Sequence, residues 1–298
     1  MAREFDSTQL EYLQRNEAVR ADYATAFVCW FKCNDITNGY CLMSICNRII
    51  NGHNIALYAQ GAVAGDPVRF QMSTPVGGWV IADTTAGYTA NTWHHACGIW
   101  AYTDDRRVFL DGGNKGTDAT ACLPTVNTTA IGVMCRPAPA SYLDGCIAEA
   151  AIYGLGAWPG ATFAIKADNF EKILPSLAAG YSPLNFPLGL RAYWPLIRDD
   201  DLDIRDNFDL TPFNTPTVAE HPGIIMPMRS QLTTPKSVRV GFGKFRSDPM
   251  LTGKTKSVPA LSGGLINKPA LTGKMKSEAA IIGGLINRPA LTGKLKNS

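Results

Sequence analysis

Residues 92–116 read TWHHACGIWAYTDDRRVFLDGGNKG, and this stretch decides the fold. Over residues 94–101, His95, Cys97, Ile99 and Ala101 alternate with the residues between them, at the period of two that a pleated strand requires. A polar turn follows at 103–105, and residues 107–110 (RVFL) predict a return strand. Asp111-Gly112-Gly113 then supplies the residues that a second tight turn with positive φ requires. The stretch therefore predicts an antiparallel hairpin.

This hairpin resembles the central hairpin of laminin-G-like, concanavalin-A-type lectin sandwiches. Residues 142–153 (YLDGCIAEAAIY) resemble the late strand of that family, and residues 26–32 (AFVCWFK) resemble its early strand with a buried tryptophan. The resemblance implies an all-β fold, an antiparallel two-sheet jelly-roll sandwich of the concanavalin-A-like type. We expect Trp30 and Ile152 to lie between the two sheets. The sandwich hosts lectins, hydrolases and structural modules, so it does not decide the function.

Further strands and one helix complete the predicted domain. Short β-like runs punctuated by Gly, Asn and Pro are expected at 41–45, 55–58, 68–72, 79–82 and 128–133. Apolar residues at three- and four-residue steps predict a helix near 160–179, with Gly180 as its C-cap. Residues 188–197 are expected to form the last strand. The predicted domain therefore covers residues 1–225, and 226–238 form a linker.

The sequence after the linker is periodic. From 239 to 298 a glycine recurs every ten residues, and two kinds of decapeptide alternate, which gives a super-period of twenty. A ten-residue unit is too small to bury its own apolar side chains. We therefore expect a β-rich tail that mediates assembly, preferably of a homotrimer, through Leu271, Ile281, Ile282, Leu285, Ile286 and Leu291. The alternative is disorder, which the Gly, Pro and Lys content favours.

Charge divides the chain into unlike parts. Residues 229–298 hold 13 Lys or Arg and 2 Asp or Glu, a net charge of +11. The remainder of the chain holds 15 Lys or Arg and 23 Asp or Glu, a net charge of −8. The basic tail suits an acidic partner, or its lysines only solvate a stalk. We do not expect nucleic acid as the partner, because aromatic residues in the tail are limited to Phe242 and Phe245.

Composition limits the remaining classes. No apolar run reaches the roughly 20 residues needed to cross a bilayer, and the polar N-terminus shows no secretory signal. We therefore expect no membrane partner and a protein that is made in the cytoplasm. All eight cysteines lie between Cys29 and Cys146, at spacings that fit no common zinc pattern. We expect free buried thiols, with disulfides as the alternative.

Candidate residues for chemistry are few. Glycoside hydrolysis needs two carboxylates about 5–10 Å apart. The late strand offers only Glu149, so we expect no enzyme activity. The His94-His95 pair is interpreted as structural. The densest carboxylate cluster gives the candidate metal ligands Asp199, Asp201 and Asp203, for which calcium is the only cofactor we consider. Its alternative is a solvated acidic loop. Candidate glycan-binding aromatics are Trp79, Tyr88, Trp100, Tyr102 and Trp158, whereas Trp194 is expected in the core.

The overall layout resembles virion proteins of tailed bacteriophages. It combines a lectin-like sandwich, the strand YWPL at 193–196, an Asp-rich loop, His221-Pro222 and short LTGK repeats. The resemblance implies a non-enzymatic virion structural protein (capsid decoration, fibre or spike) that is assembled in the host cytoplasm. Its sandwich would face outward and bind cell-surface glycans, while the basic tail would bind other virion proteins. The alternative is a secreted carbohydrate-active enzyme or its carbohydrate-binding module.

Overall fold

The computed structural model describes residues 2–19, 24–74, 78–197, 201–205 and 208–226, and five two-residue strands in the tail. The chain divides into two compact units, Met1–Pro227 and Met228–Ser298. Apart from residue 226 and those five strands, the predicted linker and tail lie outside the described residues. Within the described part of the chain, no helix is both long and apolar enough to cross a membrane.

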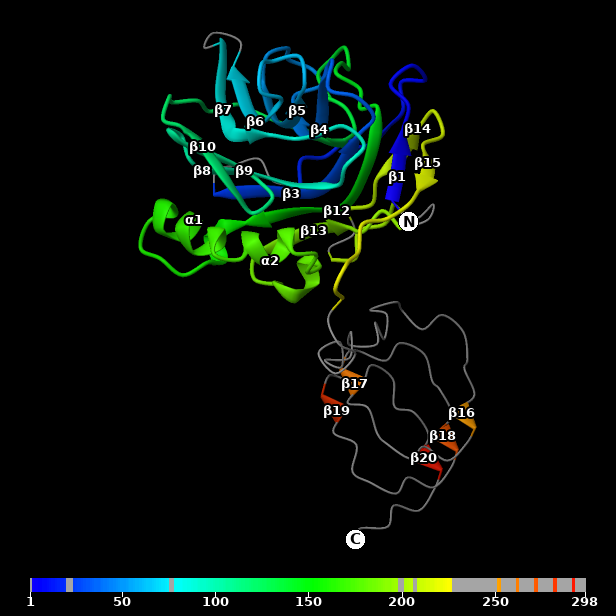
Figure 1. The fold of residues 1–298 in the computed structure, drawn as a ribbon. Coiled ribbons are helices and arrows are strands. Elements are labelled where there is room, and N and C mark those ends of the chain that lie inside the picture. Colours follow the sequence, from blue (N-terminus) through cyan, green and yellow to red (C-terminus); the bar gives the residue numbers. More distant parts are fainter. Residues whose placement is uncertain are drawn as a thin grey trace. The chain divides into compact units, whose positions relative to one another are not determined.

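The first unit is built from two stacked antiparallel sheets (Figure 1), which confirms the predicted all-β jelly-roll sandwich. Among the described residues, the first sheet runs in the order β10 (Gly113–Asp118), β9 (Asp105–Leu110), β8 (His94–Tyr102), β3 (Thr25–Cys33), β12 (Gly145–Gly154), β1 (Ala2–Phe5) and β15 (Thr217–Ala219), with β13 (Leu190–Trp194) also paired to β12. The second sheet runs β14 (Thr211–Phe213), β2 (Tyr12–Arg15), β11 (Thr128–Ile131), β4 (Gly39–Cys46), β5 (Asn54–Gln60), β6 (Pro67–Thr74) and β7 (Gly78–Gly87).

The predicted hairpin is present as β8 and β9, and its second turn leads into β10. Asp111 and Gly112 have φ values of 53° and 73°, as the two central residues of a type I′ turn require. The Asp111 carboxylate accepts hydrogen bonds from the backbone N–H of His95 at 2.9 Å and from His94 Nδ1 at 2.8 Å. The Asp111 carboxylate thus ties the turn to β8, through the ring of His94 and the backbone of His95.

The core between the sheets draws apolar side chains from both layers. Ile152 and Trp194 belong to it and are fully buried, as predicted. The prediction for Trp30 is wrong. Phe27, Cys29 and Phe31 of the same strand point into the core, so the alternation of a strand places Trp30 on the outer face of the first sheet. There it packs beside Ala2, Cys146 and Ala148.

Helices cover the outer face of the first sheet (Figure 1). The single helix predicted near 160–179 is two helices, α1 (Phe163–Glu171) and α2 (Leu174–Ala178). Pro175 stands in the first turn of α2, where it is tolerated, but its missing N–H cannot continue the hydrogen bonds of α1. The 3₁₀ turns η1 (Leu155–Ala157) and η2 (Pro183–Asn185) flank the pair. The C-cap residue of α2 is Ala179, and the predicted Gly180 follows it with a φ of 94°, at the position where glycine commonly ends a helix.

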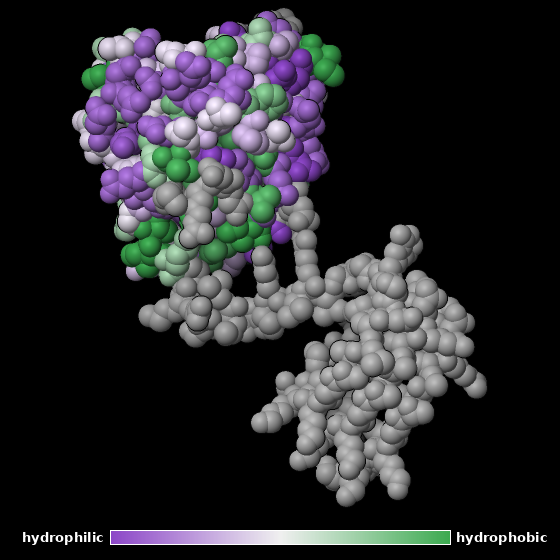
Figure 2. Space-filling view, turned by 90° about the vertical axis from the view of Figure 1, so that its right-hand side faces the viewer, coloured by the Kyte–Doolittle hydropathy of each residue, from purple (hydrophilic) through white to green (hydrophobic). Residues whose placement is uncertain are grey.

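Two further predictions about this unit can be compared with the structure. The strand expected at 188–197 is β13, but it is not the last, because β14 and β15 follow it. All eight cysteines are buried with free thiols. The side of the unit seen in Figure 2 is largely hydrophilic, and its apolar side chains gather toward the end that carries the helices.

In the second unit the structure describes only short parallel pairs. β16 (Leu251–Thr252), β18 (Leu271–Thr272) and β20 (Leu291–Thr292) pair in one sheet, and β17 (Leu261–Ser262) pairs with β19 (Ile281–Ile282) in another. Each partner lies twenty residues from the next, which equals the super-period of the sequence. Leu285 and Ile286 lie outside the described residues. The assembly role of residues 239–298 stays a prediction.

Candidate functional site

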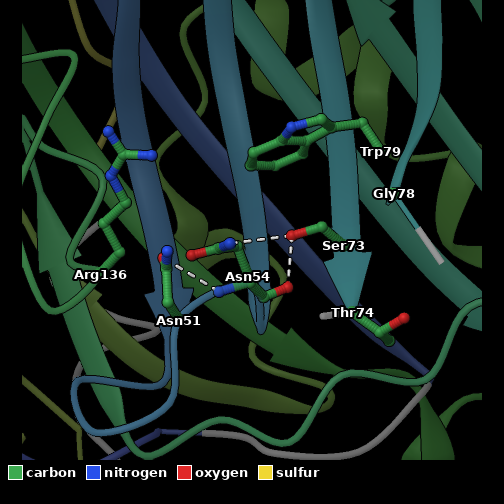
Figure 3. A pocket seen from close by; sticks show the side chains of 8 residues that line it. Asn51, Asn54, Ser73, Thr74, Gly78, Trp79 and Arg136 are labelled. Carbon is green, nitrogen blue, oxygen red and sulfur yellow. Dashed lines mark hydrogen bonds between the residues drawn. The ribbon is translucent and has the colours of Figure 1, made fainter. Parts of the chain in front are cut away.

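A cavity of about 330 Å³ lies at one end of the second sheet. β5 begins there, β6 ends there and β7 begins there, because neighbouring strands of this sheet are antiparallel. The loop that follows β11 closes the side opposite β7 (Figure 3). The lining residues are Asn51, Gly52, Asn54, Ser73, Thr74, Gly78, Trp79 and Arg136.

The row Asn54, Ser73 and Trp79 crosses the cavity. These residues are register partners on three adjacent strands, so their side chains point to the same face. Since Ile55 faces the core between the sheets, Asn54 faces outward. Asn54 Nδ2 donates to Ser73 Oγ at 2.8 Å, and Ser73 Oγ donates to the Gly52 carbonyl at 2.6 Å. The strand register therefore assembles a polar floor.

One acceptor in this floor has no partner. Asn54 is only 2% exposed, and its Oδ1 makes no hydrogen bond within the described part of the protein. A buried carbonyl oxygen without a donor costs about 1–3 kcal/mol. The oxygen is closed off from solvent, so it belongs to the packing beneath the floor and offers no contact to a ligand.

The two walls of the cavity differ in chemistry. On one side Trp79 is 45% exposed, which is a large fraction for an indole. On the other side stands Arg136 (Figure 3). It belongs to a short loop closed by the backbone pair Met134 and Ala140, and its Nε donates to the Ala138 carbonyl at 3.1 Å. The lining contains one cation and no carboxylate.

Of the five predicted glycan-binding aromatics, only Trp79 lines this cavity. The prediction of surface positions for Tyr88 and Trp100 is wrong: both are buried in the core, 2% and 1% exposed. Trp100 lies on the inward face of β8, whereas Tyr88 follows the end of β7 and packs edge-on against Phe31. Tyr102 is 45% exposed and stacks on Phe163. Trp158 is half-buried against Phe170. The structure does not bring these aromatics together.

Sequence reasoning missed the polar half of the cavity. Asn54, Ser73 and Arg136 come from three segments that only strand register and loop closure bring together. The one available signal was the Asn51-Gly52 turn, which marks the end of the sheet at which the cavity lies.

The acidic residues near 200 have structural partners where they are described. Arg3 and Asp201, both nearly buried, form a two-pronged ion pair with N···O distances of 2.7 and 2.5 Å. Asp203 accepts the backbone N–H groups of Tyr193 and Arg205 at 2.8 and 2.9 Å. Asp199 lies outside the described residues. Among the residues that the structure describes, no cluster of three His, Cys, Asp or Glu side chains is arranged to hold a metal.

Glu149 lies elsewhere, on the first sheet. It is 2% exposed, and its Oε2 accepts the Tyr193 hydroxyl at 2.6 Å. His221 Nε2 lies 3.4 Å from Oε1. Burial and the neighbouring carboxylate raise the pKa of Tyr193, so this hydroxyl stays protonated and donates. The contacts tie the segment at 221 to β12 and β13, which is a structural task.

The paired histidines also have local partners. His94 Nε2 accepts the backbone N–H of Thr89 at 3.1 Å while Nδ1 contacts Asp111. His95 is buried, with its ring 5.8 Å from that of Trp30, and burial lowers its pKa to about 4. Neither residue lines the cavity.

Comparison with known proteins agrees with this architecture. Residues 8–155 match the family model described as the concanavalin A-like lectin/glucanases superfamily. The sandwich is a lectin-like domain of the concanavalin A type. All residues that line the cavity fall inside the matched range, whereas β13, β14 and β15 of the lectin-like domain follow it. No curated protein matches the chain significantly.

Solved structures show likeness in fold alone. A putative carbohydrate-binding protein from Bacteroides ovatus is 14% identical, with 74% of this chain and 61% of that chain covered and a TM-score of 0.48. Domain 4 of an extracellular arabinanase from Geobacillus stearothermophilus, in complex with arabinotriose, is 16% identical, with 56% and 72% covered and a TM-score of 0.43. A heptameric SAP-like pentraxin from Limulus polyphemus is 12% identical, with 56% and 79% covered and a TM-score of 0.43.

Proposed function

We propose that the lectin-like domain binds a saccharide in the cavity beside Trp79 and does not cleave it. The observation that carries this proposal is the exposed Trp79 indole at the wall of a cavity whose floor is lined by amide and hydroxyl side chains. An indole face accommodates the apolar face of a sugar ring, while amides and hydroxyls pair with the sugar hydroxyls. The volume of about 330 Å³ is at the lower end of ligand pockets, so the cavity suits one sugar unit of a longer chain.

We infer binding without hydrolysis from the position of the carboxylates, none of which lines the cavity. Hydrolysis of a glycosidic bond requires two of them flanking the scissile bond. The cavity lining contains none, and Glu149 is engaged with Tyr193 on the other sheet. Turnover on a polysaccharide panel that Glu149→Gln abolishes would contradict this part of the proposal.

The experiment compares two equally exposed aromatics. Trp79→Ala removes the wall of the cavity, and Tyr102→Ala removes a side chain of the same 45% exposure that does not line it. Full-length wild-type protein and both variants are applied to a glycan array, and the best saccharide is titrated by calorimetry. Trp79→Ala should weaken binding about 10-fold or more, as expected for an aromatic contact at the centre of a site, and Tyr102→Ala should not. Equal affinities for the wild type and Trp79→Ala would contradict the proposal.

For the whole chain, the role we propose is that of a bacteriophage virion structural protein, a decoration, fibre or spike. The tail would assemble homotrimers and bind acidic surfaces of other virion proteins, and the lectin-like domain would face outward. Supporting observations are the parallel pairing at twenty-residue steps and the net charge of +11 over residues 229–298. A secreted carbohydrate-binding module is the alternative. Electron microscopy of particles labelled with an antibody to this chain separates the two, since unlabelled particles would contradict the virion role.

A further inference from the structure

Arg136 brings to the cavity a positive charge that no carboxylate among the described residues pairs with. Several arginines of the sandwich pair with carboxylates, as Arg69 does with Asp83 and Arg107 with Asp105. Arg136 has no such partner among the described residues, and its only hydrogen bond there runs from Nε to the Ala138 carbonyl. That bond orients the guanidinium and leaves its two terminal NH₂ groups available.

Two polar groups of the cavity floor already have partners within the protein. Asn51 Oδ1 accepts the Gly52 N–H at 3.1 Å, and the Ser73 hydroxyl is held between Asn54 and Gly52. Asn54 Oδ1 makes no hydrogen bond among the described residues, but it is closed off from solvent. The cavity therefore offers a cation at one wall, a polar floor and an aromatic face at the other wall (Figure 3).

We propose that the saccharide bound here carries an anionic group, a carboxylate or a sulfate ester, that pairs with Arg136. The ring of the same sugar unit lies on Trp79. The planar fork of a guanidinium fits such an oxyanion with two parallel hydrogen bonds. A neutral sugar would leave the half-buried charge without a counter-charge. This inference rests on the proposed function and names its ligand class.

The test uses the full-length chain and an array of acidic saccharides, each printed beside its neutral form. Uronic acid oligomers are paired with their methyl esters, and sulfated sugars with their desulfated forms. The best acidic saccharide and its neutral form are then titrated against wild type, Arg136→Gln and Arg191→Gln. Arg191→Gln is the matched control, because Arg191 is an exposed arginine of β13 on the other sheet.

The wild type should bind the acidic form about 10-fold or more tightly than the neutral form, the ratio expected from a hydrogen-bonded ion pair. Arg136→Gln should bring this ratio close to one, and Arg191→Gln should leave it unchanged. The pair with the larger ratio, uronate or sulfate, identifies the anionic group.

Three other results would contradict the inference that the saccharide is anionic. If wild type binds neutral and acidic forms equally and Trp79→Ala abolishes both, the inference is wrong and the proposed function stands. An acidic preference that persists in Arg136→Gln overturns the inference too, because it then originates elsewhere, for example in the basic tail. If no saccharide binds, the proposed function fails and the inference fails with it.

Discussion

Two adjacent glycines in the turn after β9 should respond in opposite ways to the same substitution. Gly112 has a φ of 73°, and a Cβ built there would lie 2.8 Å from Pro175 Cα and 3.0 Å from the Leu174 carbonyl oxygen. Gly113 lacks the positive φ, and nothing lies within 4 Å of its Cβ position. The pair tests whether this turn is the contact between the hairpin and α2.

The expected magnitudes follow from these contacts. Alanine in the left-handed region costs about 1–2 kcal/mol, and a Cβ forced against helix backbone costs about 1–3 kcal/mol more. Gly112→Ala should therefore destabilise the sandwich by about 3 kcal/mol, which for a domain of this size lowers Tm by roughly 6–12 °C. Gly113→Ala should be neutral or stabilise by up to about 1 kcal/mol, because alanine restricts the unfolded chain.

The assay is thermal unfolding of both variants at neutral pH, followed by tryptophan fluorescence and by far-UV circular dichroism. Equal shifts in Tm for the two variants would refute the reasoning, since only the turn conformation and the approach of α2 distinguish the two positions. A Gly112→Ala variant as stable as wild type would show that α2 is not packed on the turn.

Three further predictions concern pH, thiols and the tail. Burial lowers the pKa of His95 from 6.5 to about 4. As pH falls, the imidazole of His95 is therefore protonated in the unfolded chain before it is protonated in the folded protein. About 3 kcal/mol of unfolding free energy should be lost as pH falls from 6.5 to 4, and His95→Phe should remove that loss in urea titrations. All eight thiols are buried, and burial raises the pKa of Cys146 to about 11. Iodoacetamide should therefore leave the native protein unmodified at neutral pH but alkylate the denatured chain. Rapid labelling of the native protein would contradict this. Deleting residues 239–298 should leave a folded monomer in sedimentation experiments, whereas a truncated protein that still oligomerises would show that the tail is only a tether.

The fold was predictable because its strongest signals are local. Asp111 and Gly112 select one turn type, and the strands on either side alternate clearly. The orientation of Trp30 was not predictable in the same way. β3 is covered on one face by the second sheet and on the other by helices and Trp93, so neither face is polar and alternation does not tell which one faces the core.

The site was predictable only in its aromatic wall. An exposed Trp at the start of a strand is a reasonable candidate from sequence, and Trp79 is one. Tyr88 and Trp100 are candidates of the same kind in the sequence, yet tertiary packing buries both side chains. Asn54 and Arg136 are 82 positions apart in the chain, and nothing in a single sequence specifies the register and loop closure that place both at one cavity.

The most direct test of the saccharide site follows the indole N–H signals of the six tryptophans by NMR during titration with the saccharide selected on the array. Trp79→Phe assigns the signal of the cavity residue, and Trp194, whose Nε1 donates to the Phe208 carbonyl at 2.8 Å in the core, serves as an internal reference. The Trp79 signal should shift in proportion to occupancy while that of Trp194 stays fixed. A shift confined to Trp93 or Trp158, with Trp79 unmoved, would contradict a site in this cavity.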